Sequence, residues 1–194
     1  MNHPGKTKMN TCIAFEGSSQ IAAGEVADVA LKVKEVVDRG EQAPVLIFDD
    51  DTSQLVEIDF RGSAEDVVTR LRPVDEAVRR PGRPRLGVVS REVTLLPKHW
   101  DWLGMQPGGA SVALRKLVEQ ASRANQGQDR LRTARESAYR FMSAMAGNEP
   151  GFEEATRALF AGNRERFEQE TAVWPVDVQA HARRLAGKTF EPGE

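Results

Sequence analysis

Cysteine is nearly absent from this sequence, which has only Cys12 among its 194 residues. A single cysteine excludes an intrachain disulfide and a cysteine-rich metal site. The chain has no run of about 18 apolar residues, which excludes a membrane-spanning helix. Residues 1–10 also lack the apolar region of a signal peptide. These absences predict a cytoplasmic protein with no membrane partner.

Motifs for catalysis are missing as well. Neither a P-loop nor a Rossmann glycine pattern occurs, and His3, His99 and His181 are not at metal-ligand spacing from one another. Cys12 lies in a predicted strand, and nothing in the pattern supplies a base to activate it. Residues 49–51 are three aspartates that could bind Mg²⁺ or Ca²⁺, or form a polar turn. We therefore predict no enzyme, no catalytic residues, no cofactor and no metal.

Charge is distributed unevenly along the chain, although the net charge is only −2. Residues 1–78 have a net charge of −7 and residues 141–194 a net charge of −3. Between them, residues 79–98 have a net charge of +5 and residues 111–140 of +4. This layout concentrates positive potential in the middle of the sequence.

Residues 10–72 predict a small α+β unit of order ββαββα. Apolar residues recur every three or four positions over 25–37, which is typical of an amphipathic helix. Residues 55–60 alternate apolar and acidic side chains, the pattern of a half-buried strand. Ser63 and Asp66 have the form of a capping box for a second helix. The other predicted strands are 11–15 and 20–22, which form a hairpin about the turn at 17–19, and 45–48.

The remaining chain predicts a basic Pro/Arg-rich linker over 73–87, a strand followed by two helices over 88–126, and a helical C-terminal region over 127–187. The fold class is therefore α+β. The first helix of the middle segment, 98–105, is predicted to turn Trp100, Leu103 and Trp102 inward. A polar break at 125–128 is predicted to separate helices 110–124 and 129–146. The predicted C-terminal helices are 152–160, 164–173 and 175–186. Asn163 is placed to cap the second of them.

Residues 91–118 resemble the ribbon–helix–helix family. They contain a Leu96-Pro97 step, a helix, a Gly108-Gly109 turn and a second helix that begins near Ser111. The resemblance implies that strands of two chains pair into a ribbon narrow enough for the DNA major groove. It also implies that the start of the second helix faces a phosphate. A homodimer and double-stranded DNA are the implied partners.

The strand of this segment departs from the family's pattern. Val93 and Leu95 share one face, and Thr94 and Leu96 share the other, whereas a DNA-reading ribbon alternates polar with apolar residues. An apolar outer face indicates that another part of the protein covers the strand. The segment is then either a DNA-binding unit or the dimerisation fold of a structural or adaptor protein.

An arginine-rich arm precedes the strand. Its Gly82-Arg83-Pro84 core, flanked by arginines, resembles an AT-hook. Prolines keep such a segment extended, and an extended arginine strip fits the narrow A·T minor groove. The alternative interpretation is a solvated hinge.

The DNA-binding hypothesis assigns contacts to three groups. The arm contacts phosphates or the minor groove, the ribbon region contacts the duplex nearby, and the second helix anchors a phosphate, in a protein that regulates transcription. The predicted DNA-binding residues are Arg79, Arg80, Arg83, Arg85, Arg91, Thr94, Lys98, Ser111, Arg115 and Lys116.

Two aromatic features have both a structural and a functional interpretation. Trp100, Trp102 and Trp174 could stack on bases, but tryptophan at helical spacing is more often found in a core or an interface. Residues 139–160 are rich in Met and Phe. They predict either a small helical core or a groove for a partner.

The whole chain, from about residue 10 to residue 186, resembles the bacterial domain-of-unknown-function 2239 family. That resemblance implies a bacterial cytoplasmic protein, but no activity and no catalytic residues. The segments that carry it are Thr11-Cys-Ile-Ala-Phe, Leu46-Ile-Phe-Asp-Asp, Arg85-Leu-Gly-Val-Val, Glu92-Val-Thr-Leu-Leu-Pro and residues 139–160.

Overall fold

The computed structural model describes residues 11–40, 42–71 and 91–190. The chain divides into two compact units. Residues 7–76 and 130–194 form the first, here called the sheet unit, and residues 1–6 and 77–129 form the second, here called the basic unit. The fold is mixed α+β, as predicted. The predicted division into four segments stays a prediction.

The sheet unit contains a three-stranded antiparallel sheet of order β2-β1-β3. β1 (Thr11–Glu16) and β2 (Ser19–Glu25) form the predicted hairpin, and β3 (Val45–Asp49) pairs with the other edge of β1. α1 (Val26–Asp38) connects β2 to β3. These elements confirm the prediction made from the strand and helix periodicities.

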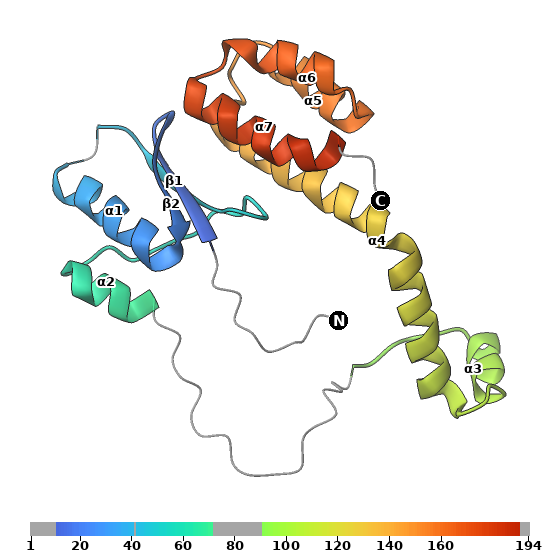
Figure 1. Cartoon of the computed structure of the whole chain (residues 1–194). Coiled ribbons are helices and arrows are strands. Elements are labelled where there is room, and N and C mark those ends of the chain that lie inside the picture. The colour runs from blue at the N-terminus through green and yellow to red at the C-terminus, as the bar shows by residue number, and fades with distance from the viewer. Residues whose placement is uncertain (1–10, 41, 72–90, 191–194) are drawn as a thin grey trace. The chain divides into compact units, whose positions relative to one another are not determined.

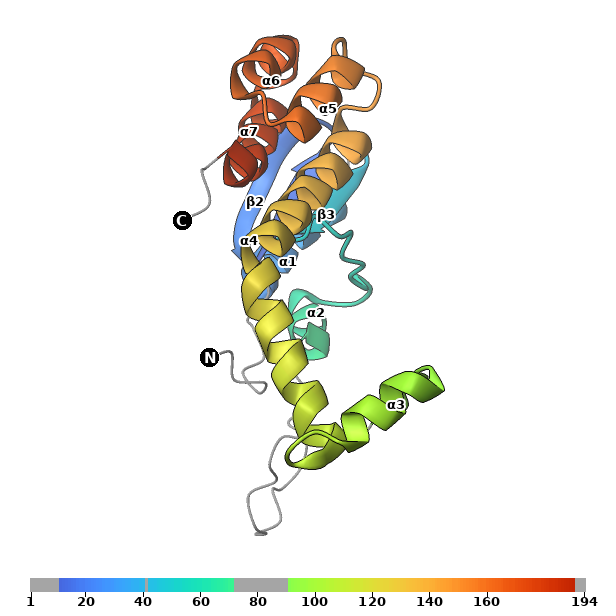
Figure 2. The ribbon, with the colours of Figure 1, turned by 90° about the vertical axis from the view of Figure 1, so that its right-hand side faces the viewer.

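Alternate residues of β1 point to opposite faces of the sheet. Cys12 and Ala14 are buried in one cluster with Val29 and Val33 of α1. Phe15 is buried in a second cluster on the other face, which the C-terminal helices cover. Figures 1 and 2 show the sheet between α1 and these helices.

The predicted fourth strand, residues 55–60, does not form. Its backbone pairing with the sheet is limited to an isolated bridge between Phe48 and Leu55. This bridge includes a hydrogen bond of 2.9 Å from the Val56 amide to the Ile47 carbonyl. The order of this region is therefore ββαβα, not ββαββα.

Side-chain packing explains the alternation in residues 55–60 without a strand. The apolar side chains still pack against the α1 side of the sheet, while the acidic side chains are exposed. The guanidinium of Arg70 donates to the carbonyl oxygens of Asp59 and Arg61, so one acceptor of this segment, the Asp59 carbonyl, is satisfied outside a ladder. The apolar residues concerned are Val56, Ile58 and Phe60.

α2 (Ala64–Leu71) begins at the predicted capping box. The amide and hydroxyl of Ser63 each donate to the Asp66 carboxylate at 2.9 Å, and the Asp66 amide donates to Ser63 Oγ at 3.2 Å. The first two bonds, the backbone one foremost, lower the pKa of Asp66. Val67, on the inner side of α2, is completely buried.

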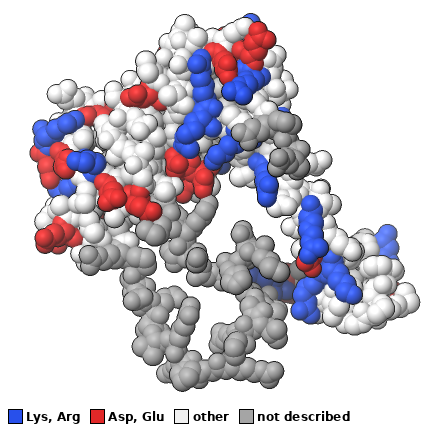
Figure 3. All heavy atoms as spheres, viewed as in Figure 1, with Lys and Arg blue, Asp and Glu red and all other residues white. Residues whose placement is uncertain are grey.

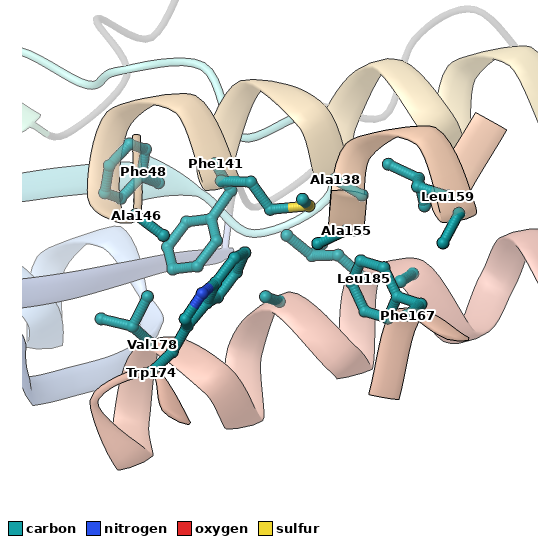
Figure 4. Packing of buried hydrophobic residues seen from close by; sticks show 14 of the residues in the cluster. Phe48, Ala138, Phe141, Ala146, Ala155, Leu159, Phe167, Trp174, Val178 and Leu185 are labelled. Atoms are coloured by element: carbon teal, nitrogen blue, oxygen red, sulfur yellow. The ribbon is translucent and has the colours of Figure 1, made fainter. Parts of the chain in front are cut away.

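Four helical segments build the second cluster: residues 130–145 of α4 (Gly109–Met145), α5 (Phe152–Ala161), α6 (Arg164–Glu170) and α7 (Val176–Phe190). Figure 4 shows Phe141 of α4 beside Phe48 of β3, and their ring centroids are 5.4 Å apart. Met142 and Leu159 are also fully buried. Residues 139–160 therefore do form a helical core, as one of their two interpretations predicts.

The ends of the C-terminal helices follow the predictions closely at one site and depart from them at another. Asn163 caps α6 by accepting from the Arg166 amide at 3.0 Å. A 3₁₀ turn, Thr171–Val173, follows α6. α7 continues past Gly187, because burial of Thr189 and the contact of Phe190 with the Phe167 ring (5.7 Å) stabilise one more turn. The predicted end before Gly187 is therefore wrong.

In the basic unit, α3 (Pro97–Gly104) precedes the first part of α4. The predicted break at 125–128 is wrong, because α4 is one helix of 37 residues. The segment has no proline, and its one glycine costs only about 1 kcal/mol within a helix. The amide of Asn125 donates to the Ala121 carbonyl at 2.9 Å, a bond along the helix rather than a break in it.

Candidate nucleic-acid interface

The two helices of the basic unit are joined by a glycine turn, as predicted (Figure 1). Gly108 and Gly109 have φ values of +86° and +73°, a region that glycine adopts without strain. A Cβ on Gly108 would lie 3.1 Å from the Cβ of Val112. The turn therefore needs glycine at position 108 for both backbone and packing reasons.

Residues 91–96, the described part of the predicted strand, have no secondary structure in the single chain. Residues 88–90 lie outside the described residues. A ribbon strand pairs with a second chain, so the ribbon itself stays a prediction. The ribbon–helix–helix resemblance is not confirmed.

The described part of the basic unit buries very few side chains. Between residues 91 and 129, only Leu103 and Ala113 are buried. Trp100 is 43% exposed and Trp102 48% exposed, so the prediction that they face inward is wrong for both. One short helix offers too little surface to cover two indole rings. The large exposed apolar residues of this region are Val93, Leu96, Trp100, Trp102, Met105, Leu117 and Val118.

Three of the predicted DNA-binding lysines and arginines lie on these helices, all exposed. Lys98 is in the first turn of α3, and Arg115 and Lys116 are in the second turn of α4. Arg115 Nε donates to the carbonyl of Ser111 at 3.0 Å. Among the described residues, neither lysine forms an ion pair. Their charges are therefore available to an anionic partner.

The remaining predicted residues fall into three groups. Ser111 is exposed in the first turn of α4. Arg91 and Thr94 are exposed in the segment before α3. The arm arginines, which lie outside the described residues, are Arg79, Arg80, Arg83 and Arg85.

Two basic residues were missed by the sequence prediction. Arg123 and Arg130 follow Lys116 at intervals of seven residues and are exposed. Seven residues are close to two turns of a helix, so the three side chains share one side of α4. Arg123 pairs with Glu119. The regular spacing was a usable signal, but the expected break at 125–128 concealed it.

The aspartates at 49–51 form a turn, the alternative to a metal site. Asp49 Oδ1 accepts from the amide and hydroxyl of Thr52, both at 2.8 Å. Asp50 pairs with Arg184, and Asp51 Oδ1 lies 3.4 Å from the Lys188 ammonium. Within the described ranges, no group of three or more His, Cys, Asp or Glu residues could hold a metal ion.

The other singled-out residues of the sheet unit are in its core. Burial, with smaller contributions from Asp49 and Asp50, raises the pKa of the Cys12 thiol and so disfavours its nucleophilic form. Trp174 is buried, and its indole Nε1 donates to the Pro150 carbonyl at 2.9 Å. His99, on α3 of the basic unit, is exposed.

A helix long and apolar enough to span a bilayer does not occur among the described residues. No curated protein and no solved structure matches the chain. One family model matches residues 11–186, and its description is "Uncharacterized protein conserved in bacteria (DUF2239)". Because that match covers most of the 194 residues, the chain belongs to the DUF2239 family of bacterial proteins.

Proposed function

We propose that this protein is a homodimeric DNA-binding protein that regulates transcription, with the basic unit as its DNA-contacting part. The observation that carries the proposal is the exposure of Lys98 in the first turn of α3 and of Arg115 and Lys116 near the start of α4. The unit contains ten Lys or Arg against four Asp or Glu, a net charge of +6. Figure 3 shows Lys and Arg side chains gathered on its visible face. A polyanion is the partner that such a surface attracts.

The start of α4 supplies phosphate contacts in this proposal. The first amides of a helix have no partner within the helix, and its dipole favours negative charge there. Ser111 adds a hydroxyl donor at the same end of α4. Lys116 adds a charge one turn further on. The arm arginines, from Arg79 to Arg85, extend these contacts along the backbone or into the minor groove.

The segment before α3 supplies both a dimer contact and a contact to DNA. We expect residues 91–96 to pair with the same residues of a second chain. Val93 and Leu96 are each 55% exposed, so no described element covers this segment. That openness favours a DNA-facing ribbon, with Arg91 and Thr94 beside the duplex, over a covered strand.

Titration of a fluorescent DNA duplex at two salt concentrations tests the proposal. Neutralising about six phosphates gives a steep fall in affinity with added salt. Lys116→Glu should weaken binding and reduce the salt slope by about 1 or more. Lys32→Glu, at an exposed position of α1 in the sheet unit, is the matched control and should leave both unchanged. No binding below about 100 μM at low salt would contradict the proposal.

A second candidate function is that of a structural or adaptor protein that uses the basic unit only for dimerisation. The seven large exposed apolar residues in the described part of that unit favour it. A stable dimer that fails to bind DNA would select this alternative. Neither candidate assigns a catalytic activity, and both place the protein in the bacterial cytoplasm.

A further inference from the structure

Residues 115–130 of α4 are exposed without exception. Helix propensity alone gives such a stretch little stability in water. Its stability in proteins comes mainly from burial of one apolar side. A partner that covers one side of this stretch would therefore account for the helix.

The sequence of the stretch has a seven-residue pattern, written abcdefg. With Leu114 at position a, apolar or small residues occupy five of the six a and d positions, which alternate at spacings of three and four residues, and Gln128 occupies the sixth. This is the pattern by which two helices pack along a seam. The six seam residues are Leu114, Leu117, Ala121, Ala124, Gln128 and Leu131.

The charged residues avoid this seam completely. Every charge between positions 114 and 131 falls at b, c or f, on the outer side of the helix. The e and g positions that flank the seam hold Val118, Gln120, Asn125 and Gly127, all uncharged. Nothing along the seam therefore repels an identical helix. The outer charged residues are Arg115, Lys116, Glu119, Arg123, Asp129 and Arg130.

We infer that residues 114–131 pair with the same residues of a second copy in an antiparallel two-stranded coiled coil. Its two-fold axis passes near Ala121 and Ala124. The inference deepens the proposed function and rests on it for the homodimer, because it names a second surface, besides residues 91–96, through which the two chains associate. Lys116, Arg123 and Arg130 face outward in such a pair and stay available to phosphates.

The order of side-chain sizes along the seam indicates that the two helices pair in antiparallel orientation. It reads large, large, small, small, large, large from either end. An antiparallel pair therefore sets Leu114 opposite Leu131 of the second copy, and Ala121 opposite Ala124, where the two helices approach most closely. A parallel pair would bring both helix N-termini and both copies of Arg115 and Lys116 to one end. Repulsion between these charges and the aligned dipoles disfavours that direction.

Sedimentation of the full chain tests the seam. Ala124→Asp puts a carboxylate at the centre of the seam, and Gln126→Asp puts the same group on the outer side two residues away. We expect the first to weaken dimerisation at least tenfold and the second to leave it unchanged. A monomeric wild-type chain at about 100 μM, or a dimer that Ala124→Asp leaves intact, would overturn the inference.

Disulfide trapping tests the direction. Cys12 is replaced by alanine, and Leu114→Cys and Leu131→Cys are made in separate chains. A disulfide needs Cα atoms within about 7 Å, so an antiparallel pair cross-links only when the two chains are mixed. Cross-linking of the Leu114→Cys chain with itself would show a parallel pair and overturn the direction.

Different experimental results would contradict the seam and the DNA-binding proposal. If Ala124→Asp dissociates the dimer while the wild-type chain binds no duplex, the seam stands and the proposed function is wrong. If the wild-type chain binds duplex while the Ala124→Asp chain stays dimeric, the seam is wrong and the DNA proposal stands.

Discussion

The imidazole of His181 packs against the ring of Phe141, with centroids 4.4 Å apart and planes inclined at 59°. Phe15 approaches the same imidazole at 5.9 Å. This side chain of α7 therefore joins the sheet to α4. Arg184 lies 3.2 Å from its Nδ1, while Nε2 is buried with no hydrogen-bond partner among the described residues. The environment suits a neutral ring, because a second ring proton would be buried without an acceptor.

We predict that His181 makes stability depend on pH between 6.5 and 4. Burial, followed by the charges of Arg184 and Lys188, lowers the pKa of His181 from 6.5 to about 4. In that interval the unfolded chain binds the proton and the folded chain does not, so the free energy of unfolding falls as the pH falls. The loss is about 3 kcal/mol across the interval. Urea unfolding of His181→Phe should show a correspondingly flatter profile than the wild-type chain.

The matched control for this prediction is His99→Phe. His99 lies at an exposed position of α3, outside the core that holds His181. Its profile should follow that of the wild-type chain. If the His181→Phe profile falls as steeply as the wild-type profile, other groups cause the acid sensitivity.

Ser137→Ala tests how the aspartate turn is attached to α4. Ser137 is 2% exposed, donates to the Asp51 carbonyl at 2.8 Å, and lies 3.0 Å from the hydroxyl of Ser53. The substitution leaves the Asp51 carbonyl and the buried Ser53 hydroxyl without this partner, so we expect a loss of about 1–3 kcal/mol in unfolding free energy. Ser143→Ala, on an exposed position of α4, should change stability little. Equal effects of the two substitutions would contradict this role for Ser137.

Tryptophan fluorescence distinguishes the tryptophan of the sheet unit from the two tryptophans of the basic unit. Trp174 is 3% exposed, whereas Trp100 and Trp102 are about half exposed. Trp174→Phe should remove the blue-shifted, quencher-resistant part of the emission and cost about 1–2 kcal/mol, because the Pro150 carbonyl loses its indole donor. Trp100→Phe should remove only emission that acrylamide quenches. Efficient quenching of all three tryptophans in the wild-type chain would contradict the assignment.

Features decided by neighbouring residues were predictable from the sequence. The β1–β2 hairpin, α1, the Ser63–Asp66 capping box and the Asn163 cap all depend on contacts between residues close in the chain. Their signals are spacing and capping chemistry, which a single sequence displays directly.

Features decided by contacts between residues distant in the chain were not predictable from the sequence. Residues 55–60 have the alternation of a strand, but their pairing depends on what else satisfies their backbone, here Arg70. Each of residues 125–128 is by itself of a type common in loops. A helix nevertheless continues through them, because no proline interrupts it. Trp100 and Trp102 look like core residues, but the described part of their unit offers no cover.

The candidate site was predictable to the extent that local helices carry it. Lys98, Ser111 and Lys116 were placed on the correct elements. Arg123 and Arg130 were missed because their alignment with Lys116 depends on an unbroken α4. Whether a helix continues depends on the summed helix propensities of many residues. The low propensity of Gly127 led the sequence-based prediction to place a break there.

Gly127→Ala tests the continuity of α4. A Cβ at position 127 would meet no atom within 4 Å, and the residue lies within the helix. Alanine should therefore raise the free energy of unfolding by about 0.5–1 kcal/mol, because it loses less backbone entropy than glycine on folding. Gly108→Ala is the contrasting substitution, since its φ of +86° and the 3.1 Å approach to Val112 both oppose a side chain. It should destabilise the chain by about 1 kcal/mol or more. Urea unfolding followed by circular dichroism measures both, and a destabilising Gly127→Ala would show that α4 breaks where the sequence alone predicts.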